Sequence, residues 1–551
     1  MKKLIIFFFT IIALGSCQDD FLDKKPLDAV SDEDVWSDIY LAEAFLNNIY
    51  SVRGYDGYSR RHETWCYGCF MLDAGSDDGK NSFTWTEAEK LNLNTFTTED
   101  APLANTWADM YRQIRNTNLF LSRIDNVANG EASAKDILKG EAKFLRAFFY
   151  FELMKQYGGV PLITTPQELT GELNVPRSTY DESADFVTKE LDEAAALLPV
   201  NATQTGRASK GAALALKGRV LLYWASPLNN PGNDKSRWEK SAAASQEVIS
   251  LGKYSLFPNY ATLFQPENEN NVEVIFDKQY IYPVRPHFHN TFHTPYSKSQ
   301  FQSGWGGTNA TQEFVDSYEM EDGLSITESP LYSENDPYKD RDPRFYATVL
   351  FDEAKFTIGG VERTIETRTE GDNGIGQNQD ATKTGYYIGK FLDKKYAVTY
   401  ARSGGEDSEQ NWIFIRYAEV LLNYAEARNE AVGPDESVYS AVNEVRKRVN
   451  MPALPGGLSY TQMRDRIRNE RRVELAFEEH RFWDIRRWKI AEQVLNGPVH
   501  GMQITKDAGG TRTFNRFPVE TRNFTNRNYV FPIKQSEVTK STGLLEQNPG
   551  W

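Results

Sequence analysis

Helical periodicity governs which folds this chain can adopt. Apolar residues recur about every 3.6 positions through most of residues 31–255. The same pattern returns at residues 411–430, 436–449, 460–478 and 480–495. Segments this long favour a mainly α protein.

Start and stop signals divide the first region into separate helices. Ser133-x-x-Asp136, Thr179-x-x-Glu182 and Ser236-x-x-Glu239 have the form of capping boxes or the Asp variant, which predict helix starts. Gly158-Gly159-Val160-Pro161 and Ser226-Pro227 predict helix ends.

A weak internal repeat indicates how these helices are arranged. The pattern Gly140-x-Ala142-x-x-Leu145 recurs as Gly211-x-Ala213-x-x-Leu216 at an offset of 71 residues, about twice the 34-residue tetratricopeptide period. Generic Ala-rich packing explains the match equally well. Residues 256–407 instead carry Gly, Asn, Pro, aromatics and short β-like runs. We therefore predict a tetratricopeptide-like superhelix of helical hairpins with a large irregular lobe of loops and short strands. Long irregular insertions are usually functional, so this lobe should carry the ligand site.

The N-terminus has the pattern of an export signal. Lys2 and Lys3 precede the uncharged run Leu4–Leu14 and then Gly15-Ser16-Cys17. This run is too short to span a bilayer, and residues 1–16 read as a cleaved signal peptide. Leu14 to Cys17 resembles the bacterial lipobox, so we expect Cys17 to be acylated and residues 17–30 to form a tether. The alternative is an ordinary signal with a cysteine nearby.

Charge and motif content exclude several functions. The chain has 62 Lys and Arg against 77 Asp and Glu, a net charge of −15, which excludes a basic nucleic-acid binder. It has no Gly-x-Ser-x-Gly, Walker, Gly-x-Gly-x-x-Gly or His-Glu-x-x-His motif, so we expect no catalytic residues. A glycosidase needs only two carboxylates, and this alternative stays open.

Three clusters could in principle bind metal. Cys66-Tyr67-Gly68-Cys69 with His62 lacks a fourth zinc ligand, so a Cys66–Cys69 disulfide or two buried thiols is the favoured interpretation. The histidines His287, His289 and His293 are interpreted as polar loop residues. We expect no cofactor, although calcium could stiffen the acidic loop Asp73–Asn81.

Two aromatic-rich loops are the candidate ligand site. Sugars present apolar faces and a rim of hydroxyls, so a site that binds them combines flat rings with Asn, Asp or Arg. The alternative is that each ring is buried in the lobe. The candidates are Trp65, Tyr67, Asp78, Asn81 and Trp85 in the first loop and Tyr296, Phe301 and Trp305 in the second.

An acid-rich helix near the C-terminus has a structural interpretation. Glu470, Glu474 and Glu478 recur every four residues, which places them on one helix face with Arg466 and Arg481 near its ends. We predict an ion-pair network that locks two helices together, in preference to an active site.

The chain resembles the SusD/RagB family of outer-membrane lipoproteins over essentially the whole mature protein. The matching segments occur in the family's order. They are Asp20-Phe21-Leu22-Asp23 after Cys17, Arg146–Phe151, Tyr157–Leu162, Trp412–Leu422, Glu470–Glu478, Arg481–Asp484, Phe531-Pro532-Ile533 and Gln547–Trp551.

The resemblance implies a hinged lid over a transporter barrel. By it we assign residues 31–255 to the N-terminal helical region, 256–407 to the ligand lobe, and 408–551 to the C-terminal helical region and tail. We expect a surface-exposed outer-membrane lipoprotein that captures an oligosaccharide and delivers it to a SusC-like TonB-dependent transporter. The alternatives are a peptide-binding member of the family and a surface glycoside hydrolase. The matching segments are scaffold signatures, so no binding residue transfers through them.

Overall fold

The scaffold is an array of helices. The computed structural model describes residues 35–51, 70–103, 105–168, 173–299, 303–396 and 408–551. Within these residues, no helix is both long enough and apolar enough to span a bilayer. The array and its extension are α3 (Ile39–Tyr50), α5 (Asn105–Arg123), α6 (Ala132–Tyr157), α7 (Tyr180–Leu197), α8 (Lys210–Ala225), α9 (Lys235–Ser250), α13 (Tyr417–Val432), α14 (Glu436–Arg448), α15 (Tyr460–Glu474) and α16 (His480–Arg487).

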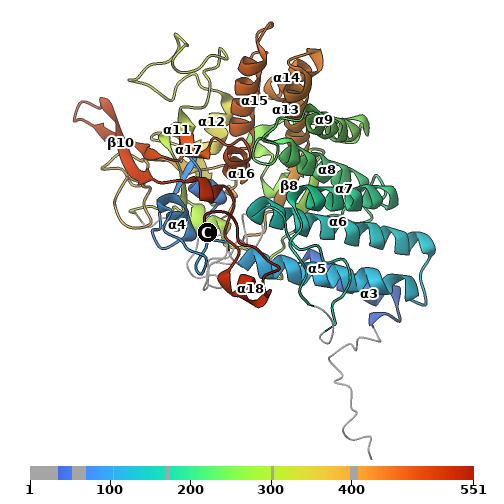
Figure 1. Cartoon of the computed structure of the whole chain (residues 1–551). Helices are drawn as coiled ribbons and strands as arrows, with labels where there is room; N and C mark the ends of the chain where they lie inside the picture. Colours follow the sequence, from blue (N-terminus) through green and yellow to red (C-terminus); the bar gives the residue numbers. More distant parts are fainter. Residues whose placement is uncertain (1–34, 52–69, 104, 169–172, 300–302, 397–407) are drawn as a thin grey trace, which may run out of the picture.

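Successive helices pack side by side from α5 to α9, and α13 then packs on α9 (Figure 1). The chain leaves the array after Ser250 and re-enters it at Tyr417. The helical scaffold is therefore continuous in space although a long insertion interrupts it in sequence. This confirms the predicted mainly α superhelix, while the segment boundaries at 255 and 407 stay predictions.

The helix boundaries test the predicted caps. Thr179 forms the predicted capping box with Glu182, and α6 ends at Gly158, whose φ is +80°. The other two predicted starts are wrong. The N-cap of α6 is Glu131, and the carboxylate of the α9 N-cap, Asp234, accepts from the Ser236 amide at 2.9 Å. An acidic residue outside the expected motif supplies the cap of α9.

The irregular lobe contains small sheets and short helices. Strand β2 (Val274–Lys278) of the lobe pairs antiparallel with β8 (Trp412–Arg416). The helix predicted from residue 411 therefore begins only at Tyr417, because its apolar and β-branched start completes a sheet. The other strands of the lobe are β3 (Thr308–Ala310), β4 (Val349–Leu350), β5 (Lys355–Ile358), β6 (Val361–Thr364) and β7 (Tyr387–Ile388), and its short helices are α10 (His289–His293), α11 (Gln312–Val315) and α12 (Pro343–Thr348). Outside residues 256–407, the remaining strands are β1 (Gly79–Asn81), β9 (Gly497–Lys506) and β10 (Arg512–Arg522), and the short helices are α4 (Glu87–Leu93), α17 (Ala491–Val494) and α18 (Gln535–Lys540).

Two large apolar cores hold these parts together. The first fills the helical array, where Phe144, Phe148 and Phe276 pack edge to face. The second lies under the lobe, and there Phe314 contacts Phe477 at 5.1 Å between ring centroids. Since Phe276 lies on β2 of the lobe, the lobe is packed into the array.

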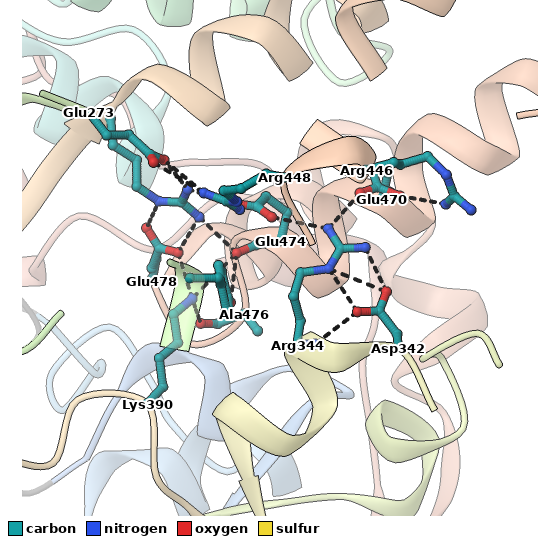
Figure 2. Close-up of polar contacts among 12 residues, drawn as sticks. Glu273, Asp342, Arg344, Lys390, Arg446, Arg448, Glu470, Glu474, Ala476 and Glu478 are labelled. Atoms are coloured by element: carbon teal, nitrogen blue, oxygen red, sulfur yellow. Dashed lines mark hydrogen bonds and ion pairs between the residues drawn. The ribbon is translucent and has the colours of Figure 1, made fainter. Parts of the chain in front are cut away.

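A buried ion-pair network also joins the lobe to the helices (Figure 2). Glu474 accepts from Arg344 at 3.0 Å and from Arg416 at 2.6 Å, and it also pairs with Arg448. Glu478 pairs with Arg416 at 2.7 Å and with Lys390 at 2.7 Å. An ion-pair network is confirmed, but it joins the lobe to the helices and its cations come from β8, α14 and the lobe. Arg481 instead pairs with Asp77.

The predicted helix face is wrong in one respect. Helix α15 ends at Glu474, and the backbone at Phe477 and Glu479 has positive φ, so Glu478 lies beyond the helix. The turn after the helix still places Glu478 in the network, because Arg416 donates to the carboxylates of both Glu474 and Glu478.

Candidate functional site

The two predicted ligand loops meet although more than 200 residues separate them. Strand β1 pairs antiparallel with β3, with Gly79 opposite Ala310 and Asn81 opposite Thr308. The pairing continues into the loops, because the Ser82 amide donates to the Gly307 carbonyl at 2.7 Å. The Ser82 hydroxyl also donates to the Gly306 carbonyl at 2.7 Å. The loops therefore form one structural unit.

Five rings gather where the loops meet. We call Phe83, Trp85, Phe288, Phe292 and Trp305 the aromatic cluster. Phe83 stacks on Trp85 with centroids 5.1 Å apart and an interplanar angle of 18°, and it meets Trp305 edge to face at 6.2 Å. Phe292 packs against Trp305 at 4.7 Å. Phe83 thus links the two tryptophans of the separate loops.

Exposure separates the ligand candidates from the supporting rings. Trp85 is 39% exposed and Trp305 is half-buried, whereas Phe83 and Phe292 are 3% exposed. A partly exposed indole that is supported by a second ring suits stacking on a sugar face. Sequence reasoning missed Phe83, Phe288 and Phe292, although their proximity to the predicted loops was a usable signal.

Glycines hold the second loop close to its surroundings. Gly306 has φ +58°, and a Cβ there would collide with the Asp380 carbonyl oxygen. A Cβ at Gly307 would lie 2.8 Å from the Phe292 carbonyl oxygen. Only glycine fits both positions, and together they fix the backbone that carries Trp305.

The acidic residues of the first loop face the protein interior. Asp78 is fully buried, and Arg472 Nε donates to its Oδ1 at 2.6 Å. Asp77 accepts from Arg481 at 2.7 Å. Burial would raise the pKa of Asp77, but the Arg481 and Arg472 guanidiniums outweigh it and hold that pKa well below its usual range. These ion pairs anchor the first loop to α15 and α16.

Two further predicted contacts are buried in this structure. Asn81 is 1% exposed, and its Oδ1 accepts from the Phe83 amide at 2.8 Å. Tyr296 is 8% exposed. Like Asp78, they support the loops, and direct ligand contact by these three residues stays a prediction. Trp65, Tyr67, Phe301, the Cys66–Cys69 pair and Cys17 lie outside the described residues.

The predicted metal candidates form no site within the described residues, where no group of three His, Cys, Asp or Glu could hold a metal ion. The His289 and His293 rings lie 4.4 Å apart, and the Thr308 amide donates to His293 Nδ1 at 3.1 Å. Burial, with the neighbouring histidines, lowers the pKa of His289 far below its usual value. These are buried histidines of the lobe.

A separate cavity of about 530 Å³ opens between α5 and α18. Its lining includes Trp107, Tyr111, Ile163 and Leu545, and no member of the aromatic cluster. Its size falls within the range of small-molecule sites. It is a competing location for a ligand.

Comparisons with known proteins agree on one family. The model described as "SusD family" matches residues 263–551, and one described as "Starch-binding associating with outer membrane" matches residues 20–222. A solved SusD-like protein from Bacteroides fragilis is 32% identical, with 96% of this chain and 100% of that chain covered and a TM-score of 0.81.

Two further relatives cover nearly the whole chain. A SusD-like carbohydrate binding protein from Bacteroides fragilis is 28% identical, with a TM-score of 0.77, over 92% of this chain and 98% of that one. SusD-like protein P25 of Formosa agariphila is 26% identical over 90% of this chain and 91% of its own length.

Proposed function

Because the chain belongs to the SusD family, we propose that it captures an oligosaccharide at the cell surface and delivers it to a SusC-like TonB-dependent transporter. Binding proceeds by ring stacking and hydrogen bonds, without chemical conversion of the glycan. The protein is held on the outer membrane by acyl chains on Cys17, and each buried CH₂ contributes about 0.8 kcal/mol to that anchoring.

The observation that carries the glycan proposal is the junction of the two loops at Phe83. Phe83 stacks against the partly exposed indole of Trp85 and contacts a second indole, that of Trp305, from the other loop. A related structure that is a carbohydrate binding protein supports this ligand class. Delivery to a transporter and lipid anchoring are supported by the family relationship and by the lipobox.

Two alternatives make different demands on the site. A peptide ligand needs polar groups that pair with its backbone, whereas the exposed feature of the joined loops is a flat ring. A surface glycoside hydrolase would release new reducing ends from a candidate polysaccharide. Incubating the protein with a candidate polysaccharide and measuring reducing ends therefore distinguishes binding alone from hydrolysis.

The central experiment compares Trp85→Ala and Trp305→Ala by calorimetry on a glycan found in a panel screen. Loss of a stacked aromatic anchor should cost about 1–3 kcal/mol, which weakens affinity roughly 5- to 150-fold. Tyr40→Ala is the matched control, because Tyr40 is an exposed aromatic on α3. Unchanged affinity in both tryptophan variants would remove the aromatic cluster from the site and favour the cavity between α5 and α18.

A further inference from the structure

Arg486 is a buried cation without a carboxylate partner in the described part of the chain. It is 3% exposed, and Nη1 donates to the Phe482 carbonyl at 2.8 Å. Its guanidinium lies 3.6 Å from the centroid of the Phe482 ring. Its Nε is buried and has no hydrogen-bond acceptor in the part of the chain that the structure describes. Burial, offset only by Tyr529, lowers the pKa of Arg486 to about 9.

Neighbouring arginines of α16 show the contrast. Arg487 pairs with Glu426 at 2.5 Å and with Asp484 at 2.8 Å. Arg481 pairs with Asp77 at 2.7 Å. A buried charge without compensation costs several kcal/mol, so the charge on Arg486 calls for a counter-ion.

A second buried polar atom without a partner lines the same cavity. The Tyr180 hydroxyl, at the start of α7, has no hydrogen-bond partner among the described residues. Tyr180 and Arg486 both line a cavity of about 20 Å³, together with Lys155, Tyr223, Trp483 and Arg487. A space of this size holds one water-sized particle.

We propose that this cavity binds one small inorganic anion of about the size of chloride, held by the Arg486 guanidinium and the Tyr180 hydroxyl. Lys155 and Arg487 also line the cavity, but Lys155 is paired with Glu152 and Arg487 with Glu426, so the charge that an ion would balance is that of Arg486. Water would satisfy the hydrogen bonds but would leave the charge of Arg486 uncompensated. An anion satisfies both requirements.

The proposed ion joins two distant parts of the chain. Tyr180 begins α7 of the helical array, whereas Arg486 lies on α16 after the lobe. An anion bound by both side chains stabilises only the folded arrangement, so halide should raise the thermal stability of the protein. This effect is independent of any ligand at the aromatic cluster.

Two measurements test the site on the full mature protein. Crystals grown in sodium bromide should show an anomalous peak between Arg486 and Tyr180. In solution, chloride replacing gluconate at constant ionic strength should raise the melting temperature by about 1 °C at ten times its Kd. Arg486→Met should abolish both signals. Arg115→Met, at an exposed arginine of α5, should preserve them.

Tyr180→Phe covers the case in which Arg486→Met fails to fold. It removes one hydrogen bond to the ion, so it should weaken the apparent chloride affinity about tenfold or more. The proposal is overturned if the crystals show electron density in the cavity without an anomalous bromide peak, because the cavity then holds water. It is also overturned if chloride raises the melting temperature of wild type and of Arg486→Met equally.

Discussion

Replacing Glu474 by Gln should strongly destabilise the protein, because its carboxylate lies at the centre of the buried ion-pair network. The network contains six acids and six bases, so its formal charge balances. They are Glu273, Glu319, Asp342, Glu470, Glu474 and Glu478 with Arg344, Lys390, Arg416, Arg446, Arg448 and Arg466. Glu474→Gln is nearly isosteric, yet it leaves one excess positive charge in the interior.

The expected cost follows from burial. Glu474 is 0% exposed and pairs with Arg344, Arg416 and Arg448. Removing one partner from a buried pair typically costs about 3–5 kcal/mol. For a chain of this length, that cost corresponds to a decrease in melting temperature of roughly 3–4 °C. Differential scanning calorimetry at pH 7 measures it directly.

The loss of stability at low pH gives a second test of the role of Glu474. Burial raises the pKa of Glu474, but Arg448, Arg416 and Arg344 outweigh it and hold that pKa well below its usual value. The carboxylate thus contributes stability above the unfolded pKa, and this contribution is lost as pH falls towards the folded pKa. Glu474→Gln should lack that loss.

The matched control is Glu537→Gln, which breaks the exposed Lys540–Glu537 pair on α18. Exposed pairs contribute about 0–1 kcal/mol, so this variant should melt close to wild type. If Glu474→Gln cost no more than Glu537→Gln, the buried network would not hold the lobe on the helices.

Two further variants probe the site and the pH response. Gly306→Ala should weaken glycan binding severalfold, because its added Cβ collides with the Asp380 carbonyl oxygen and so displaces Trp305. Gly252→Ala is the control with matched backbone strain, since Gly252 has φ +61° and no atom lies within 4 Å of an added Cβ. Equal losses of glycan affinity in the two variants would contradict a role for Gly306 in placing Trp305. Burial, only partly offset by Arg207, raises the pKa of Glu141 from 4.5 to about 7. Between pH 4.5 and 7 this carboxyl is therefore protonated in the folded protein and ionised in the unfolded chain, so the free energy of unfolding falls as pH rises through this range. Glu141→Gln should flatten the melting-temperature profile from pH 5 to 7, and an unchanged slope would count against this assignment.

Local patterns predicted the scaffold better than the site. The helix end at Gly158 and the capping box at Thr179 depend on residues within one turn, and both are confirmed. The helix predicted from residue 411 failed because the fate of Trp412–Arg416 depends on β2, more than 130 residues earlier. Within the predicted loops, the sequence identified aromatic residues but not their supporting partner Phe83.

The sequence by itself determined the helical array and the balance of acids and bases, because periodicity and caps act over short distances. Tertiary structure alone decided which groups meet. It exposed Trp85 but buried Tyr296, it turned Asp78 towards Arg472, and it left Arg486 without a carboxylate among the described residues. The physical reason is that burial and charge pairing depend on neighbours hundreds of residues away, which local spacing does not specify.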